Sequence, residues 1–507
     1  MQGDGCFSGT MGKGILNRDN LKKTVRYLKK NGICHAYYAA RERIEEERKD
    51  HYHYTEPSGT VLEMQRAQTA DFPYLFSIVV PAYETKERFL REMIDSVRRQ
   101  SYERWELVIV DASGSGLVER TVEAIREETE EERIRYRHLR ENKGIAGNTN
   151  AGIEMAAGDY IALLDHDDFL APDALYHMAS AIHKAAEEGE LPVLLYSDED
   201  KYEEGDGTTA SCICGTDRIQ DVENRHDNNG SYRQPHRKLG FNLDLILSNN
   251  YICHFMAVQA ELLKRLKLRE EYDGAQDYDL VLRVVDEVYQ TTPVQDFMHR
   301  LIHIPHVLYH WRCHEESTAQ NTASKSYAYE AGRRALQDFC SRRGWQAEVE
   351  HGLHLGFYEI TYLPDLLSVR SEVGITGGRI LDGRGRICNG AYREDAGCMY
   401  EGLPKEYSGG STHRAVLKQD VCAVDIRCMQ VTPALWEVYE QITGLPYRER
   451  MIRCGRGRKK AGKYIADITG IHCDEAGYRK LSMELGKAAA MQGYLVVWDP
   501  AVFCKKQ

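Results

Sequence analysis

Three carboxylates at the end of one apolar segment are the strongest chemical signal in this sequence. Residues 160–164 are Tyr-Ile-Ala-Leu-Leu, and Asp165, Asp167 and Asp168 follow. In an α/β protein such a segment is expected to be a strand of a parallel sheet, with its carboxylates at the edge where ligands bind. Hard cations such as Mg²⁺ and Mn²⁺ prefer oxygen ligands. The spacing therefore predicts a metal site for a diphosphate, although Asp168, four residues before Pro172, also fits the start of a helix.

The elements that must position these carboxylates alternate between apolar strands and amphipathic helices. Buried strands are expected at 76–80, 105–110, 134–139, 160–164 and 193–196, and helices at 90–97, 150–157 and 172–186. This alternation is the pattern of an α/β fold whose central sheet is mostly parallel and covered on both faces. Glu84, Asp111 and Asp198 follow other strands of the series. Carboxylates are therefore expected to gather along one edge of the sheet.

The composition bounds the class of protein. The chain has 507 residues, a formal net charge of −12 and 42% hydrophobic residues, a length that favours about three domains. The negative charge argues against a dedicated nucleic-acid binder, which needs a broad basic face. No apolar run approaches the ~20 residues that span a bilayer and no signal-peptide core follows Met1, so we expect a soluble cytosolic protein. The fourteen cysteines are scattered, and reduced thiols are expected.

Two local basic runs stand out against this acidic background. Residues 21–30 place three apolar side chains on one helical stripe with lysines around it, and Gly32 stands where such a helix would stop. This pattern fits either a helix docked on the main domain or a helix at a membrane surface. Residues 448–463 form a second run, interrupted by glycines. It indicates an exposed loop that is either merely solvated or in contact with anionic lipid headgroups.

Several further motifs follow one another in a fixed order between residues 75 and 342. They are Pro81 and Tyr83 at the end of the first strand, Asp111 after the second, Asn142, Lys143 and Gly144 followed by Asn148 and Asn150, the carboxylates at 165–168, Gln276 and Asp277 ahead of 279–283, and His310, Arg312 and His314. Together they resemble a family 2 glycosyltransferase with the GT-A fold, the fold of enzymes that use nucleotide-diphosphate sugars. The stretches 196–201 and 250–254 resemble the branch that includes bacterial rhamnosyltransferases and other enzymes that build surface polysaccharides.

The resemblance implies a donor site along the carboxylate edge. Asp111 and Glu84 would hydrogen-bond the base and ribose of a nucleotide sugar, and Asp165 would lie near the ribose and a divalent metal, Mg²⁺ or Mn²⁺. Asp167 would bind that metal, which offsets the charge on the leaving nucleoside diphosphate. The remaining implied donor-binding residues are Pro81, Tyr83, Lys143, Gly144 and Asn150.

The resemblance also implies roles for residues later in the chain. Asp277 would be the general base that removes the proton of the acceptor hydroxyl, giving inversion in one displacement. His310 would be a third metal or diphosphate contact, with His303 and His306 as competitors, and Arg312 would pair with phosphate oxygens. Two alternatives stay open: Asp277 only caps its helix, and the histidines are ordinary core residues.

Two positions depart from the family pattern. The second strand usually ends in two acidic residues, whereas Ala112 follows Asp111 here, and Gln276 stands where a glutamate is usual. Neither change removes a residue whose charge the implied transfer reaction requires. Both keep open a second hypothesis, in which the chain is a noncatalytic nucleotide- or glycan-binding scaffold of a polysaccharide assembly complex. A sugar nucleotidyltransferase is disfavoured, because 81–84 lacks the Gly-rich basic loop that holds a triphosphate.

Three units are expected along the chain. Residues 1–70 would be a helical N-terminal extension and linker, 75–355 the catalytic domain, and 356–507 a truncated second module. Strands at 373–383 and 493–500 resemble the latter half of a second glycosyltransferase unit without a nucleotide-binding front half. Such a degenerate α/β module suits packing, acceptor binding or association.

The leading hypothesis is an inverting, metal-dependent glycosyltransferase of the hexosyltransferase type that extends a cell-surface polysaccharide. Its expected partners are a UDP-, dTDP- or GDP-sugar donor and a glycan or lipid-linked glycan acceptor. Peripheral contact with the inner face of the plasma membrane is also expected, and nucleic acid is not. Donor sugar, acceptor and linkage depend on loop contacts that motifs do not resolve.

Overall fold

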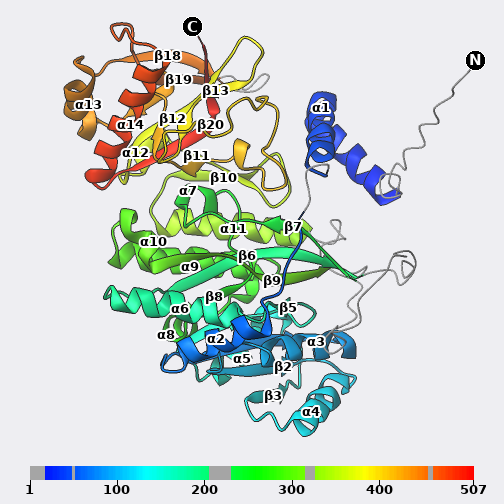
Figure 1. Cartoon of the computed structure of the whole chain (residues 1–507). Coiled ribbons are helices and arrows are strands. Elements are labelled where there is room, and N and C mark those ends of the chain that lie inside the picture. The colour runs from blue at the N-terminus through cyan, green and yellow to red at the C-terminus, as the bar shows by residue number, and fades with distance from the viewer. Residues whose placement is uncertain (1–17, 48–51, 205–229, 314–325, 455–460, 507) are drawn as a thin grey trace, which may run out of the picture.

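The structure is a computed structural model that describes the chain except for residues 1–17, 48–51, 205–229, 314–325, 455–460 and 507. The motif residue His314 therefore lies outside the described residues. Figure 1 shows a large α/β unit, coloured blue to green, with a smaller yellow-to-red unit above it. Helix α1 (Arg18–Glu47) lies beside the smaller unit.

Within the described chain, nine strands form the main sheet in the order β3-β2-β1-β4-β8-β6-β9-β5, with β7 paired to β6. Their bounds are β1 (Phe76–Ala82), β2 (Trp105–Asp111), β3 (Ile134–His138), β4 (Tyr160–Leu163), β5 (Phe169–Leu170), β6 (Leu194–Glu203), β7 (Ser231–His236), β8 (Met256–Gln259) and β9 (Leu301–Cys313). Strands β1 to β4 pair in parallel, as do β6 and β9, whereas β8 runs antiparallel to β4 and β6. The expected α/β class is confirmed, with a parallel half and a mixed half.

Helices cover both faces of this sheet. They are α2 (Gly59–Thr69), α3 (Glu87–Arg98), α4 (Leu117–Thr129), α5 (Gly144–Met155), α6 (Ala174–Glu187), α7 (Leu243–Ile246), α8 (Ala260–Leu266), α9 (Gln276–Thr291), α10 (Phe297–Arg300) and α11 (Ser326–Arg342). Alternate strand residues enter different apolar clusters: Val79 and Val108 pack in one, Ile78 and Leu107 in the other. Because both faces are buried, the central strands are apolar at nearly every position.

The register of the parallel strands brings their carboxyl ends together. Ala82 of β1 pairs with Asp111 of β2, and Val79 of β1 pairs with Leu163 of β4. Side chains that follow these strands therefore emerge at one edge of the sheet, where α/β proteins bind their ligands. This edge carries the carboxylates that follow β1, β2 and β4.

After α11 the chain builds the smaller unit. Its described strands include an antiparallel hairpin of β10 and β11, and a five-stranded sheet in which β12 and β20 pair in parallel. The strands expected at 373–383 and 493–500 correspond to β12 and β20. The bounds are β10 (Ala347–His351), β11 (Tyr358–Tyr362), α12 (Leu366–Val369), β12 (Val373–Leu381), β13 (Ile387–Asn389), β14 (Ala391–Tyr392), β15 (Gln419–Asp420), β16 (Ala423–Val424), β17 (Met429–Val431), α13 (Trp436–Thr443), β18 (Glu449–Cys454), β19 (Ala461–Ala466), α14 (Glu475–Met491) and β20 (Leu495–Lys505).

Buried charged groups join the two units. Arg370 is fully buried and donates two 2.8 Å hydrogen bonds to the carboxylate of Asp244. Asp420 of β15 accepts hydrogen bonds from the backbone N–H groups of Leu243 and Asp244, at 2.5 and 3.2 Å. Burial, and then the charge of Asp244, raise the pKa of Asp420 well above its ordinary value. Such a cluster resists separation, because an unpaired buried charge would remain.

The N-terminal helix has two segments. Gly32, with φ of 82°, breaks α1, so the expected stop is present but a second helical segment continues to Glu47. Glu42 of that segment accepts hydrogen bonds from the backbone N–H groups of Gly409 and Gly410, at 2.7 and 2.8 Å. The helix is thus docked on the smaller unit rather than on the main domain. Across the described residues, no helix combines the length and the apolar character that crossing a bilayer requires.

Candidate active site

The carboxylates expected to bind metal lie just beyond β4. Asp165 and Asp167 occupy the turn between β4 and β5, and Oδ2 of Asp165 is 3.7 Å from Nε2 of His254. Desolvation raises the pKa of Asp165 above its ordinary value, and the carboxylate of Asp167 adds to this rise while His254 opposes it. The turn therefore concentrates negative charge, which favours a positively charged ligand.

Asp168, the third carboxylate of the motif, has a structural role. It is buried and accepts hydrogen bonds from the hydroxyl of Tyr309, at 2.5 Å, and from the backbone N–H of Arg312, at 2.8 Å. These bonds tie the turn after β4 to β9. Asp165 and Asp167 are therefore the carboxylates of the motif that remain as candidate ligands.

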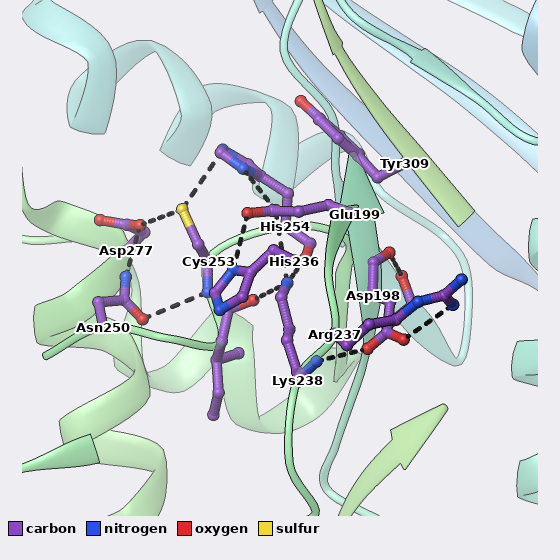
Figure 2. Close-up of polar contacts among 12 residues, drawn as sticks. Asp198, Glu199, His236, Arg237, Lys238, Asn250, Cys253, His254, Asp277 and Tyr309 are labelled. Atoms are coloured by element: carbon purple, nitrogen blue, oxygen red, sulfur yellow. Dashed lines mark hydrogen bonds and ion pairs between the residues drawn. The ribbon is translucent and has the colours of Figure 1, made fainter. Parts of the chain in front are cut away.

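His254 connects Asp165 to a buried acid. Its Nδ1 is 3.2 Å from Oε2 of Glu199, and its ring stacks on Tyr309 with centroids 4.7 Å apart. Figure 2 shows His254 between Glu199 and Cys253. Desolvation acts to lower the pKa of His254, but its contacts with Cys253 and Glu199 outweigh that effect and raise the pKa well above its ordinary value. The imidazole is thereby held with Nε2 toward Asp165.

Glu199 on β6 is held in turn by three basic groups. Its Oε1 is 3.3 Å from Nδ1 of His236 and its Oε2 is 3.4 Å from Nζ of Lys238, besides the contact with His254. Lys238 also donates to the carbonyl oxygens of Ile252, at 2.6 Å, and His254. Desolvation would raise the pKa of Glu199, but Lys238 and the two histidines lower it well below its ordinary value. An ionised Glu199 is therefore a fixed support for His254.

Asp277 lies in the first turn of α9 and faces the same loop. Its Oδ2 accepts a 2.8 Å hydrogen bond from Nδ2 of Asn250 and is 3.7 Å from Sγ of Cys253. The N-cap residue of α9 is Ala275, and no side chain makes a capping bond there. Asp277 therefore does not cap its helix. In Figure 2, Asp277, Cys253 and His254 follow one another across the site.

Glu84 and Asp111 lie in different environments at the nucleotide side of the edge. Glu84 is exposed, and its Oε1 accepts from the N–H of Gly114 at 2.9 Å. Asp111 is fully buried and accepts from the hydroxyl of Tyr136 and the N–H of Ser113, both at 2.9 Å. Oγ of Ser113 accepts from the N–H of Glu84 at 2.7 Å. Asp111 therefore shapes the loop, and Glu84 is the carboxylate that faces solvent.

The Asn-Lys-Gly loop before α5 is closed by its own asparagines. Oδ1 of Asn142 accepts from the N–H of Gly144 and from Nδ2 of Asn148, at 3.0 and 2.9 Å. Oδ1 of Asn148 accepts from the N–H of Lys143 at 3.1 Å. Gly144 has φ of 77°, and a Cβ there would lie 2.3 Å from Oδ2 of Asp273, so the position requires glycine. The loop presents the exposed side chain of Lys143.

The other three expected donor-binding residues of the strands and loops differ in accessibility. Tyr83 is 53% exposed just past β1, and Pro81 lies within β1, paired with Val110. Asn150 exchanges two 2.8 Å hydrogen bonds with the backbone N–H and carbonyl of Leu268. This exchange uses both ends of the Asn150 amide, so Asn150 ties α5 to the segment after α8 rather than facing a ligand.

Arg312 and His310 are held by acids of other elements, which corrects their expected roles, although Nε of Arg312 also donates to the backbone carbonyl of Asp167 at 2.8 Å. Arg312 is 1% exposed and pairs with Glu92 and Glu204, at 2.5 and 2.9 Å. His310 is equally buried, with Nδ1 2.7 Å from Asp200. Buried charged and polar groups need partners inside the protein. Both side chains have theirs, so neither is placed for phosphate or metal.

The two competing histidines are also engaged elsewhere. Nε2 of His303 is 2.8 Å from Asp198, and the ring of His306 stacks on His177 at 4.0 Å. None of the three candidate histidines therefore contacts Asp165. The described histidine that does is His254.

His254, which contacts Asp165, lies in the motif at 250–254, but the sequence alone predicted no function for its side chain. The antiparallel register of β8 with β4 pairs Met256 with Leu163. Two residues outward along each strand are His254 and Asp165, so this register brings them together. The sequence carries both residues but not the pairing, because β4 and β8 are about a hundred residues apart.

A metal ion at this edge would need ligands besides the protein. Among the described residues, no group of three or more His, Cys, Asp or Glu side chains is arranged to hold one. Mg²⁺ commonly binds through one or two carboxylates and completes its shell with substrate phosphates and water. Asp165 and Asp167 fit that donor set. Desolvation is the main cause of the raised pKa of Asp165 and the charge of Asp167 adds to it, and a cation bound between them would relieve that repulsion.

A cavity of about 200 Å³ opens beside Glu199, between the two units. Trp311 of the main unit lines it together with Phe357 and Thr412 of the smaller unit. Oδ1 of Asn249, on its wall, is buried without a hydrogen-bond partner. Aromatic faces with an unsatisfied polar atom are typical of a site for a polar ligand.

Comparison with known proteins identifies the class. Residues 77–266 match the family model described as glycosyl transferase family 2. Residues 77–266 are therefore a family 2 glycosyltransferase domain, and the resemblance seen in the motifs of this stretch is confirmed.

Individual relatives extend this likeness. The chain is 37% identical over 275 residues to the uncharacterized protein y4gI of Sinorhizobium fredii, and 32% identical over 277 residues to the O-antigen biosynthesis protein RfbC of Myxococcus xanthus. These matches cover 53% and 54% of this chain but 26% and 19% of those proteins. The putative glycosyltransferase EpsH of Bacillus subtilis is 26% identical, with 52% of this chain and 69% of that protein covered. A solved structure of S. aureus TarS with UDP-GlcNAc gives a TM-score of 0.35 at 16% identity, covering 52% and 65%.

Proposed function

We propose that the chain is an inverting, metal-dependent glycosyltransferase that moves a sugar from a nucleotide sugar to a hydroxyl group of a growing surface polysaccharide. One observation carries the proposal: the loop 250–254 contacts the expected metal carboxylate, Asp165, at one end and the expected base, Asp277, at the other. A sugar transfer needs these two functions close together, because the leaving diphosphate and the attacking hydroxyl lie on opposite sides of one carbon atom. The similarity to RfbC, an O-antigen biosynthesis protein, supports a polysaccharide product.

Donor binding falls to the exposed groups of the edge. In this proposal the exposed Tyr83 and Glu84 would meet the base and ribose, and the exposed Lys143 would meet the diphosphate. Asp165 and Asp167 would hold Mg²⁺ or Mn²⁺, which when bound offsets the charge of the leaving nucleoside diphosphate. His254 acts through Asp165 as a positioning residue, since Glu199 fixes its ring and its Nε2 faces that carboxylate.

Asp277 accepts the proton of the attacking hydroxyl. Asn250 orients the Asp277 carboxylate through Oδ2. General bases of this kind contribute about 10²- to 10⁴-fold to the rate. Attack from the side of Asp277, opposite the diphosphate, inverts the configuration at the anomeric carbon.

The cavity beside Glu199 is our candidate for the acceptor glycan. Trp311 and Phe357 offer aromatic faces to sugar rings, and the Trp311 ring lies 6.0 Å from that of His254. Thr412 makes the smaller unit a wall of this cavity. We therefore propose that residues 356–507 help to bind the acceptor and have no donor site of their own. An acceptor carried on a membrane lipid would place the enzyme peripherally at the inner face of the plasma membrane.

A noncatalytic scaffold is the second candidate function. It is favoured by Asp111, which is buried and leaves Glu84 as the exposed carboxylate of the base-binding loop. A scaffold would bind nucleotide sugar without cleaving it.

Release of nucleoside diphosphate distinguishes the two candidates. The chain would be incubated with UDP-, dTDP- and GDP-sugars, with Mg²⁺ or Mn²⁺ or with a chelator, and with lipid-linked glycans as acceptors. A glycosyltransferase releases nucleoside diphosphate from one donor and stops when the metal is removed. Donor binding without release under every condition would favour the scaffold.

A further inference from the structure

The cavity of about 200 Å³ between the two units contains two positively charged side chains that are not paired with an acid. Nζ of Lys201 donates to Oε1 of Gln234 at 2.9 Å and lies 5.7 Å from the centre of the Trp311 ring. Arg414 donates a 2.6 Å hydrogen bond to the backbone carbonyl of Arg237. Neither side chain forms an ion pair with a carboxylate of the described residues. Both positive charges therefore remain for a ligand in the cavity.

The two acids of the cavity wall are already bonded inside the protein. Glu199 is held by one lysine and two histidines, as Figure 2 shows. Asp200 is 1% exposed. Its carboxylate accepts a 2.9 Å hydrogen bond from the hydroxyl of Tyr52 and lies 2.7 Å from Nδ1 of His310. These acids have partners of their own and do not neutralise the two cations.

Arg414 lies in an environment that favours a bound anion. The side chain is half-buried, and desolvation lowers its pKa below the ordinary value, an effect that neighbouring groups offset only in part. A charge that is partly removed from water without a partner costs free energy. A bound anion would restore the lost interactions, because hydrogen bonds between charged groups are about twice as strong as neutral ones.

The rest of the wall suits a sugar better than a bare anion. Trp311 and Phe357 supply aromatic rings. The buried Oδ1 of Asn249, which has no hydrogen-bond partner, needs a donor. A sugar hydroxyl supplies that donor, whereas the oxygens of an ionised carboxylate or of a diphosphate only accept. A ligand with both hydroxyl groups and a negative charge therefore matches this wall.

We propose that this cavity selects an acidic sugar of the acceptor glycan, whose carboxylate or phosphate group binds Lys201 and Arg414 while a hydroxyl group donates to Asn249. The inference rests on the proposed function, because it assigns a charge to the acceptor of that reaction. It makes Lys201 and Arg414 specificity-determining residues for the acceptor. A neutral sugar of the same shape would leave both charges unpaired.

Binding of simple glycosides, measured without donor or metal, tests the inference. Saturation-transfer nuclear magnetic resonance would compare the methyl glycosides of glucuronic, galacturonic and mannuronic acid with those of glucose, galactose and mannose, which share the ring stereochemistry but carry no charge. The 6-phosphates of the neutral glycosides form another set, which distinguishes phosphate from carboxylate as the recognised group. We expect an acidic glycoside to bind about tenfold or more tightly than its neutral counterpart.

Charge-removing variants assign this preference to the cavity. Lys201→Gln and Arg414→Gln should each remove most of it, whereas Arg414→Lys keeps the charge and should retain part. Lys201 donates to an exposed glutamine, so Lys201→Gln should fold even if Arg414→Gln does not. Thr412→Trp fills the cavity and should abolish binding. The control is the double variant Arg265→Gln, Lys480→Gln, which removes two charges from exposed ion pairs outside the cavity and should bind as wild type does.

Three results would overturn the inference. They are that no acidic glycoside binds more tightly than its neutral counterpart, that the Lys201 and Arg414 variants keep the preference, or that a nucleoside diphosphate displaces the bound glycoside, which would assign both cations to the donor. Nucleoside diphosphate release judges the proposed function separately. Release without a charge preference would refute this inference alone, whereas charge-selective binding without release under any condition would refute the transferase activity alone.

Discussion

The side-chain amide of Asn250 donates a 2.8 Å hydrogen bond to Oδ2 of Asp277. Four residues further along the same loop, His254 lies 3.7 Å from Asp165. One short loop therefore sets the positions of two carboxylates that come from distant parts of the chain. In the proposed reaction these are the carboxylates on the leaving-group side and the acceptor side, so the loop fixes the geometry of the displacement.

Loss of the Asn250 amide should damage catalysis more than binding. In Asn250→Ala the Asp277 carboxylate loses its orienting donor, and we expect kcat to fall about 10- to 100-fold with little change in the KM for the donor. Steady-state kinetics of nucleoside diphosphate release would measure both. A matched change, Asn150→Ala, removes the bonds to Leu268 and should lower Tm with a smaller effect on kcat. Equal loss of kcat in the two variants would contradict the assignment of Asn250.

Removal of the Glu199 charge should destabilise the main unit. Lys238 is 0% exposed in its side chain and would lose its carboxylate partner in Glu199→Gln. Breaking a buried ion pair typically costs about 3–5 kcal/mol, which urea unfolding would measure. Glu203→Gln, at an exposed pair with Arg233, is the control and should cost below about 1 kcal/mol. A Glu199 variant as stable as this control would refute the role of Glu199 as a support.

The contact between the two units should weaken as the pH rises. The pKa of Asp420 in the folded protein lies well above the ordinary 3.8. Its contribution to stability is therefore complete below that ordinary value and is lost as the pH rises through the raised pKa. Asp420→Asn keeps the shape without titrating, so Tm of the variant minus Tm of wild type should increase between about pH 4 and pH 8. Calorimetry would show this trend, and a difference independent of pH would be evidence against it.

Filling the cavity between the units should affect the acceptor alone. Thr412→Trp places a large side chain into the cavity that Trp311 and Phe357 line. We expect the KM for a glycan acceptor to rise about tenfold or more, while slow donor hydrolysis, which uses water as the acceptor, is unchanged. Thr469→Trp, at an exposed position of the same unit outside the cavity, is the control. If Thr412→Trp slows donor hydrolysis as much as transfer, the cavity belongs to the donor site instead.

Sequence patterns predicted those features of the fold that depend only on residues close together in the sequence. The apolar strands, the carboxylates at their ends and the glycine break in α1 are local features, and the structure contains them. Long-range pairing was the part that could not be predicted. The register of β4 with β8 selects His254 as the neighbour of Asp165, while His310 and Arg312 pair with carboxylates on other elements.

Two kinds of contact were not predicted: the contact of His254 with Asp165, and the pairing of His310 and Arg312 with acids of the protein. Both depend on which charged groups the fold brings together. A buried histidine or arginine in a motif binds a ligand only if no acid of the protein reaches it first, because buried charges are nearly always paired. Asp200, Glu92 and Glu204 are such acids. Their positions relative to β9 depend on the folded sheet, so motif spacing alone does not reveal them.

The central claim is that Asp277 removes the acceptor proton in an inverting transfer that needs a metal held by Asp165 and Asp167. The most direct measurement is nucleoside diphosphate release by wild type and Asp277→Asn, with nuclear magnetic resonance of the product to establish its anomeric configuration. We expect release that requires Mg²⁺ or Mn²⁺, a product inverted relative to the donor, and a fall of about 10²- to 10⁴-fold in the variant, while Gln276→Glu stays active. A product that retains the donor configuration, or an Asp277→Asn variant as fast as wild type, would contradict the claim.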